Sequence, residues 1–335
     1  MWTIRSFLNT DTPALAKIWS AHHQSVHSHS ACSTVVWDSC ILSKPYFFAD
    51  DLAIAIDDLG YAIGFVHFGF VGDESSQSMS KEHCAIHKIC VLPSADEDAI
   101  ARLLLAHAMH AMTARGAIVC TGLGAGGIGG FYQGIADGDN LMGVVASDTK
   151  SQKWLHDAGF VPHRPTECWE LDLASFRPPM DRLQIQTRRT CTIGRMLDED
   201  YEHWWTSAVL GHCEQTRFHL MLKSPPSLGG VLMCWSPDPT LVGLDSSLVR
   251  MILPDIPAGE ESREQFLYLV AESMRQLQQD KKRTVTSVAS ADQQQTITLL
   301  QRLGFRSVEH GLIFTKCLAR LQARWKNATA SQELH

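Results

Sequence analysis

One phrase occurs twice in this sequence, and it limits the folds that the chain can adopt. Residues 147–160 and 291–305 each have a short polar start, apolar residues at helical spacing, and then Gly-Phe. A strand-like run follows each phrase, at residues 168–173 and 311–316. Self-similarity of this kind is the signature of a duplicated structural unit. We therefore expect two copies of one domain, each occupying about half of the chain.

The same order of elements can be traced in both halves. Periodicity and turn residues predict strand, helix, three strands, helix, strand, helix and strand in each, and the second half is expected to open with a strand near residues 184–194. This order is typical of an α/β domain with a mixed, mostly antiparallel sheet flanked by helices. The prolines in Arg177-Pro178-Pro179 predict an extended linker. The expected domains and linker are residues 1–174, residues 184–330 and residues 175–183.

Composition and charge argue against several classes of partner. The formal net charge is −7, whereas nucleic-acid-binding proteins favour basic surfaces. No run of apolar residues approaches the roughly 18 that a membrane-spanning helix needs, and the first residues lack the pattern of a signal peptide. The ten cysteines are scattered without any C-x-x-C pair, which indicates a reducing compartment. We expect a cytoplasmic protein with no nucleic-acid or membrane partner and an unassigned oligomeric state.

In both halves a strand ends at a proline before a long helix, at Val91-Leu92-Pro93 and Ile252-Leu253-Pro254. Together with the repeated helix-Gly-Phe phrases and the hairpin ending in Ala62-Ile63-Gly64-Phe65, this order resembles the GCN5-related N-acetyltransferase (GNAT) family in a tandem arrangement. The resemblance covers nearly the whole chain. It implies an acyl-CoA-dependent N-acyltransferase, with acetyl-CoA as donor and a small-molecule amine or a peptide N-terminus as acceptor. The acceptor loops would be residues 20–45, 72–82 and 122–140.

The resemblance also implies where the donor binds. In this family the pantetheine arm pairs with the strand before the long helix, and the pyrophosphate lies on the N-terminus of that helix. In the first half these positions are Ile89, Cys90, Val91, Asp96, Glu97, Asp98, Ala99, Ile100 and Ala101. The family motif Gln/Arg-x-x-Gly-x-Gly/Ala is altered there, because Ala99 and Ala101 are small but three carboxylates surround the phosphate position. Two like charges 4 Å apart cost about 4 kcal/mol at an effective dielectric of about 20.

Two readings of these carboxylates stay open. If they simply cap the helix N-terminus, each contributes roughly 0.3–1 kcal/mol and the pyrophosphate meets like charge there. If their side chains swing away, the phosphate position stays available. The second half keeps only Gly259 of the motif and carries Glu260 and Glu261, so the first half is the expected active half.

The catalytic groups of the family are also altered. Leu155 and Leu300 stand where family members often carry a tyrosine acid, although a thiolate with a pKa near 8.5 can leave without one. His87 lies on the strand before the proline and is the candidate base for the amine proton. Side chains alternate along a strand, so His87 should share a face with Ala85 and Ile89. The alternative is that His87 is a packed or surface histidine. In the second half only Asp245 and Ser246 lie in the equivalent region.

Three other interpretations of the sequence compete with this one. Residues 122–127 satisfy G-x-G-x-x-G after a strand, but further glycines follow where a dinucleotide site needs a helix, and each costs about 1 kcal/mol there. The run has no counterpart in the second half, so we read it as an insertion. No metal site is expected, because the histidine clusters lack a recognised ligand spacing; they are His22, His23, His27 and His29, and His107 and His110. The remaining alternative is an inactive tandem GNAT fold that serves as a binding or scaffold protein.

Overall fold

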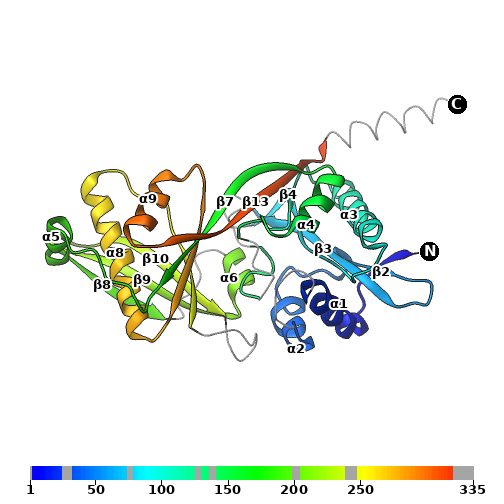
Figure 1. Ribbon diagram of the computed structural model, residues 1–335, viewed down its shortest axis with the longest axis horizontal. Helices are drawn as coiled ribbons and strands as arrows, with labels where there is room; N and C mark the ends of the chain where they lie inside the picture. Colours follow the sequence, from blue (N-terminus) through cyan, green and yellow to red (C-terminus); the bar gives the residue numbers. More distant parts are fainter. Residues whose placement is uncertain are drawn as a thin grey trace. The chain divides into compact units, whose positions relative to one another are not determined.

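The computed structural model describes residues 2–24, 32–73, 78–124, 130–135, 141–197, 204–237 and 247–319. The chain divides into two compact units (Figure 1). Unit 1 contains Met1–Arg164, Tyr201–Gly211 and Gly311–His335, and unit 2 contains Pro165–Asp200 and His212–His310. Each unit is a mostly antiparallel sheet flanked by helices, as the duplicated sequence predicts. Among the described residues, no helix is both long enough and apolar enough to cross a membrane.

The sheet of unit 1 holds six strands of the first half and one strand from the end of the chain. Its order is β1-β2-β3-β4-β5-β13, and β6 also pairs with β13. All these neighbours are antiparallel except β4 and β5, which are parallel. The strands are β1 (Thr3–Ser6), β2 (Leu52–Ile56), β3 (Ala62–Gly72), β4 (Met79–Val91), β5 (Val119–Gly122), β6 (Val144–Val145) and β13 (Arg306–Cys317).

Helices cover both faces of this sheet (Figure 1). On one face lie α3 (Glu97–Ala114) and α4 (Thr149–Asp157), and on the other lie α1 (Thr12–Gln24) and α2 (Thr34–Trp37). A short helix of the second half, α6 (Trp204–Leu210), also belongs to unit 1, where Trp205 packs beside Gly72 of β3. Three short helical turns complete the described part of the unit: Asn9–Asp11, Asp38–Leu42 and Ala49–Asp51.

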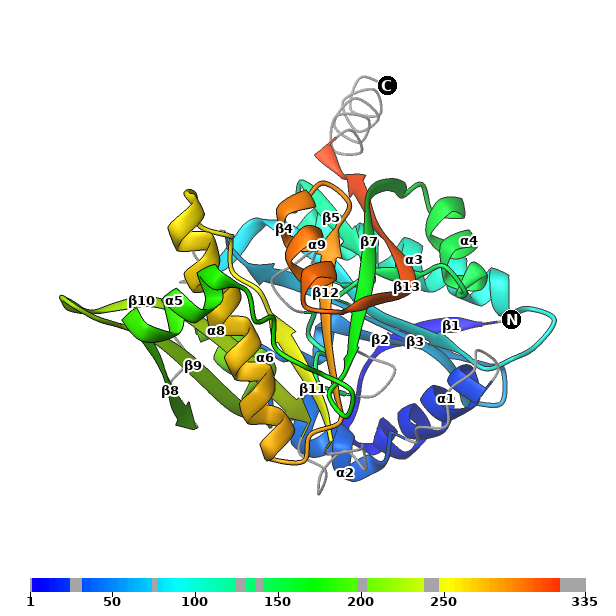
Figure 2. The ribbon, with the colours of Figure 1, turned by 60° about the vertical axis from the view of Figure 1, so that its left-hand side comes forward.

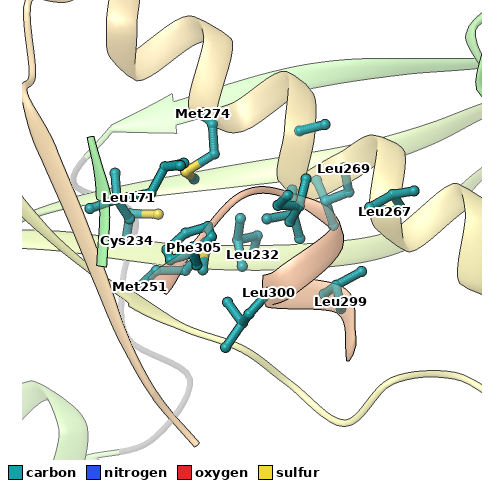
Figure 3. Packing of buried hydrophobic residues seen from close by; sticks show 14 of the residues in the cluster. Leu171, Leu232, Cys234, Met251, Leu267, Leu269, Met274, Leu299, Leu300 and Phe305 are labelled. Carbon is teal, nitrogen blue, oxygen red and sulfur yellow. The ribbon is translucent and has the colours of Figure 1, made fainter. Parts of the chain in front are cut away.

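Unit 2 has the same plan, with strand order β7-β12-β11-β10-β9-β8 and one parallel pair, β11 with β12. Figure 3 shows Leu269 and Met274 of α8 packed with Leu232, Cys234 and Phe305 in its core. Figure 2 shows α8 lying across the strands of this unit. The elements are β7 (Val161–Asp172), α5 (Arg182–Thr190), β8 (Cys191–Leu197), β9 (Cys213–Lys223), β10 (Pro226–Pro237), β11 (Leu248–Ile252), α8 (Glu260–Gln279), β12 (Thr284–Ser290) and α9 (Gln294–Arg302).

The strand expected near residues 184–194 is wrong, because α5 occupies most of that segment and β8 begins only at Cys191. The carboxylate of Asp181 accepts a hydrogen bond of 2.9 Å from the backbone N–H of Gln184. Such a side-chain bond satisfies one of the N–H groups that have no partner within a helix, and so favours a helix start. Asp181 therefore marks the beginning of a helix that the apolar pattern alone did not reveal.

The last strand of each half lies in the unit formed mainly by the other half. β7 pairs with β12 from Ser290↔Thr166 to Thr284↔Asp172. The end of β13 pairs with β5, from Phe314↔Gly122 to Cys317↔Val119. Both strands directly follow a repeated Gly-Phe phrase, so the duplication includes the strands that are exchanged. The compact units are consequently not two contiguous stretches of chain.

Because the last strands are swapped between the units, a core mutation in the last strand of one half should destabilise the unit formed mainly by the other half. Phe314 is buried among residues of α3, and Leu171 is buried among residues of α8. Phe314→Ala should therefore destabilise unit 1 by roughly 3–5 kcal/mol, and Leu171→Ala should destabilise unit 2 by roughly 2–5 kcal/mol. Hydrogen exchange resolved to single amides measures this: Phe314→Ala should speed exchange in α3 more than in α8, and Leu171→Ala should do the reverse. If Phe314→Ala speeds hydrogen exchange more in α8 than in α3, the assignment of β13 to unit 1 is contradicted.

Candidate functional site

β4 continues past the point where its ladder with β5 ends. The two parallel strands pair from His83↔Val119 to Ile86↔Gly122, but β4 runs on to Val91. On its other side, the N–H of Leu92 donates to the carbonyl of Ile63, 2.9 Å away. Backbone groups of successive strand residues point to alternate sides, so Val91 turns its N–H and C=O away from β3. Among the described residues, no strand pairs with this side of β4 at residues 87–91, which we call the open edge.

A β-bulge lies at the start of this open edge. The register between β3 and β4 changes from His67↔Lys88 to Phe68↔Ile86, which leaves His87 as an extra residue. The expectation that His87 shares a face with Ile89 is therefore wrong. Ile89 packs in the core beneath α3, whereas the His87 ring lies 5.0 Å from that of His67 on the opposite side of the sheet.

His87 is a buried, neutral histidine. Its side chain is 3% exposed, and its ring also lies 5.3 Å from that of Phe131. Burial, and secondly the charge of Lys44, lower the pKa of His87 to about 3. Its Nδ1 has no hydrogen-bond partner among the residues that the structure describes. A buried polar atom left without a partner costs about 1–3 kcal/mol, and such atoms in native proteins call for an explanation such as a catalytic or binding role.

The Gly-rich insertion contributes to the surroundings of His87. The Lys44 Nζ donates to the carbonyl of Phe131 at 2.5 Å, and the hydroxyl of Tyr132 lies 3.0 Å from Nδ1 of His67. Lys44, His67 and Tyr132 are all buried. The sequence predicted an insertion and an acceptor loop here but not these contacts, because contacts across 65 or more residues leave no local pattern. Residues 25–31, 74–77, 125–129 and 136–140 of the expected acceptor loops lie outside the described residues.

The N-terminus of α3 lies at the end of the open edge, and its carboxylates are turned towards α4. Glu97 forms an ion pair with Lys150 at 2.9 Å, and Asp98 forms one with Lys153 at 2.7 Å. Asp98 also accepts a hydrogen bond of 2.7 Å from Nε1 of Trp154. The Lys153 ammonium and then this indole lower the pKa of Asp98. Two of the three carboxylates expected to repel a phosphate therefore have cationic partners, and the side chain of Asp96 makes no capping bond to the helix.

The other predicted cofactor residues take different positions. Ile100 and Ala101 are buried in the core with Ile89 and Val91, so these side chains do not face a ligand. Cys90 is also buried, and Ala99 is partly exposed. The N–H groups of Ala99 and Ile100 both donate to the carbonyl of Asp96 at 3.0 Å. The strand residues can contribute to a site only through their backbone. An open edge followed by a helix start with two lysines is suited to an amide-containing chain that carries phosphate.

Unit 2 has a shorter open edge. Its parallel ladder ends at Arg250↔Thr286, and β11 ends soon afterwards at Ile252. The Arg250 guanidinium donates to the hydroxyl of Thr286 at 2.8 Å, which bridges the two strands where they begin to separate. Gly259 precedes α8 with a φ of 94°, and Glu260 and Glu261 occupy its first turn. Asp245 and Ser246 lie outside the described residues.

Residues 13–124 match the family model of the acetyltransferase (GNAT) family. The first half contains a GNAT domain. The matched range includes β2 to β5 and α3, so it covers the open edge and the helix start. No curated protein matches the sequence. Among the described residues, no group of three or more His, Cys, Asp or Glu side chains is placed to hold a metal ion; His27 and His29 lie outside them.

Solved structures extend this likeness to the whole chain. A tandem GNAT protein from the clavulanic acid biosynthesis pathway is 11% identical, with a TM-score of 0.65 over 95% of this chain and 99% of that one. A GCN5-related N-acetyltransferase from Sphaerobacter thermophilus is 11% identical, with a TM-score of 0.59 over 95% and 96%. The glucosamine N-acetyltransferase region of a fungal multi-domain GH3 β-N-acetylglucosaminidase is 15% identical, with a TM-score of 0.70; 94% of this chain matches 38% of that one. The chain thus has a tandem GNAT fold.

The buried histidines predict how the stability of the GNAT domain depends on pH. Burial lowers the pKa of His22 to about 4 and that of His87 to about 3. As pH falls below about 6.5, these histidines gain protons in the unfolded chain but stay neutral in the folded one, so stability decreases. Each should remove about 2 kcal/mol between about pH 8 and about pH 5. Urea unfolding measures this, and His87→Gln should reduce the pH-dependent loss by about 2 kcal/mol. If His87→Gln loses as much stability between these pH values as the native chain, His87 is not the buried, neutral histidine assigned here.

Proposed function

We propose that this protein is an acyl-CoA-dependent N-acyltransferase whose active half is the GNAT domain, with acetyl-CoA as the donor and an amine as the acceptor. The observation that carries the proposal is the open edge at residues 87–91, which leads directly to the start of α3. The equivalent edge in unit 2 is shorter and bridged by Arg250. The GNAT family in general uses acetyl-CoA as its acyl donor.

Two features of the described residues support this donor. The amides of pantetheine can hydrogen-bond to the backbone of Ile89 and Val91, because these groups point away from β3. The pyrophosphate can lie at the N-terminus of α3, where the helix dipole favours an anion. Lys150 and Lys153 offset the negative charge of Glu97 and Asp98 at that end, although Lys153 also pairs with Asp157 at 3.1 Å.

In the reaction, the amine nitrogen attacks the thioester carbonyl, a C–N bond forms and the C–S bond breaks. The amine loses one proton and the CoA thiolate gains one, so the exchange needs no net acid or base. We assign His87 to accept a hydrogen bond from the attacking amine, because it is neutral and its Nδ1 has no partner among the described residues. Leu155 has no acidic proton to donate, so the proton that the thiolate gains comes from solvent or from the acceptor amine itself.

The acceptor is an amine, either a small molecule or a peptide N-terminus. Glucosamine is a rational first choice for assay, since a structurally similar region is described as a glucosamine N-acetyltransferase. We place the protein in the cytoplasm, because all ten cysteines are among the described residues and none forms a disulfide.

A second candidate function is a catalytically inactive scaffold with the tandem GNAT fold. One observation favours it: the carbonyl of Val91, on the open edge, lies 3.3 Å from Nδ1 of His22. Titration calorimetry separates the two functions. Heat of binding with acetyl-CoA supports the transferase, and no heat at millimolar acetyl-CoA would favour the scaffold.

His87→Ala should lower kcat by roughly 100-fold or more while leaving the Kd of acetyl-CoA unchanged, because His87 contacts the acceptor and not the donor. Steady-state kinetics of acetyl transfer and calorimetry measure the two quantities. The matched control is His83→Ala, which removes an exposed histidine from the same strand and should leave both unchanged. Equal rates for His87→Ala and the native chain would remove His87 from the mechanism.

A further inference from the structure

His22 contacts the open edge at a backbone group that the donor is expected to use. It lies near the end of α1 and is 4% exposed. Its Nδ1 is 3.3 Å from the carbonyl oxygen of Val91. A carbonyl oxygen only accepts hydrogen bonds, so Nδ1 must carry the proton in this contact. The N–H of the adjacent Leu92 donates to Ile63 on β3, so the Val91 carbonyl points away from β3. The imidazole therefore lies on the side of β4 from which β5 has separated.

The surroundings of His22 hold its ring in this place. The ring lies 5.8 Å from that of Trp154 on α4, and 5.2 Å from that of His23. Trp154 is itself fixed by its hydrogen bond to Asp98 at the start of α3. Nearby, the Lys88 ammonium lies 4.6 Å from the centroid of the Trp19 ring, which also joins α1 to β4. His22 thus connects α1 to both parts of the proposed donor site, the strand edge and the helix start.

We propose that His22 competes with the acyl donor for the Val91 carbonyl. The Nδ1–H of His22 donates to this carbonyl, and the pantetheine arm must displace the imidazole to bind. The proposal rests on the function proposed above. The affinity for acyl-CoA is then set partly by the bond that His22 gives up. Removing the imidazole should strengthen donor binding, which is the opposite of what removal of an ordinary binding residue does.

The test measures the Kd of CoA by calorimetry for the native chain, His22→Leu and His23→Leu. Leucine keeps most of the packing volume and cannot donate a hydrogen bond. The loss of one competing hydrogen bond should tighten binding roughly threefold to tenfold in His22→Leu. His23 is the matched control, because it is also a buried histidine of α1, but its Nδ1 lies 2.8 Å from the carbonyl of Trp19 in the same helix. His23→Leu should leave the Kd unchanged.

A second measurement needs no variant. In the native chain labelled with ¹⁵N-histidine, addition of CoA should shift the Nδ1 resonance of His22 and leave that of His23 in place. This readout keeps the proposal testable if His22→Leu does not fold.

The outcomes separate the two proposals. Tighter binding in His22→Leu, or binding in that variant alone, supports the competitor role. If the native chain binds CoA and His22→Leu binds it equally or more weakly, the competitor role is overturned while the transferase proposal stands. In that case the Val91 carbonyl accepts hydrogen bonds from His22 and pantetheine together, or His22 itself contacts CoA. If neither protein binds CoA, both proposals fail.

Discussion

The short parallel ladder between β4 and β5 is the constraint on which the site depends. It ends at Ile86↔Gly122, and beyond it the two strands separate. A Cβ on Gly122 would lie 2.9 Å from Leu155 and 3.2 Å from Phe160, so a larger residue would force these buried side chains to shift away from the end of β5. The next residue, Leu123, has a φ of 51°, an unfavourable backbone for a bulky side chain that takes the chain out of the strand. The Gly-Phe phrase therefore helps to determine where β5 stops.

This packing gives structural roles to two residues that the sequence had linked to catalysis and to phosphate binding. Leu155 stands where the family often has a tyrosine acid, and here it fills the space beside Gly122. The first glycine of the Gly-rich stretch, Gly122, allows this close packing. The carboxylates at the start of α3 also take on a second meaning, because Glu97 and Asp98 bind Lys150 and Lys153 of the adjacent helix. In a chain of net charge −7, this local pairing is what makes an anionic donor compatible with that end of the helix.

Local pattern was enough to predict most of the repeated order of elements and the long helix α3, but it missed α5. It was not enough for features that depend on distant contacts. The bulge at His87 appears only in the register of β4 against β3, and it reverses the expected face of Ile89. The exchange of β7 and β13 leaves no signal within either half, since each strand keeps its place in the repeated order. The contact between His22 and Val91 joins residues 69 positions apart, which periodicity cannot reveal.

The central claim is that the open edge of β4 in the GNAT domain is the donor site. Hydrogen exchange at single amides, with and without saturating acetyl-CoA, tests it most directly. The N–H groups of Ile89 and Val91 should exchange more slowly when the donor is present, because they then donate to pantetheine, and Met251 and Ile252 in β11 should be unaffected. Protection in β11 without protection at Ile89 and Val91 would contradict the account, as would no protection in either strand.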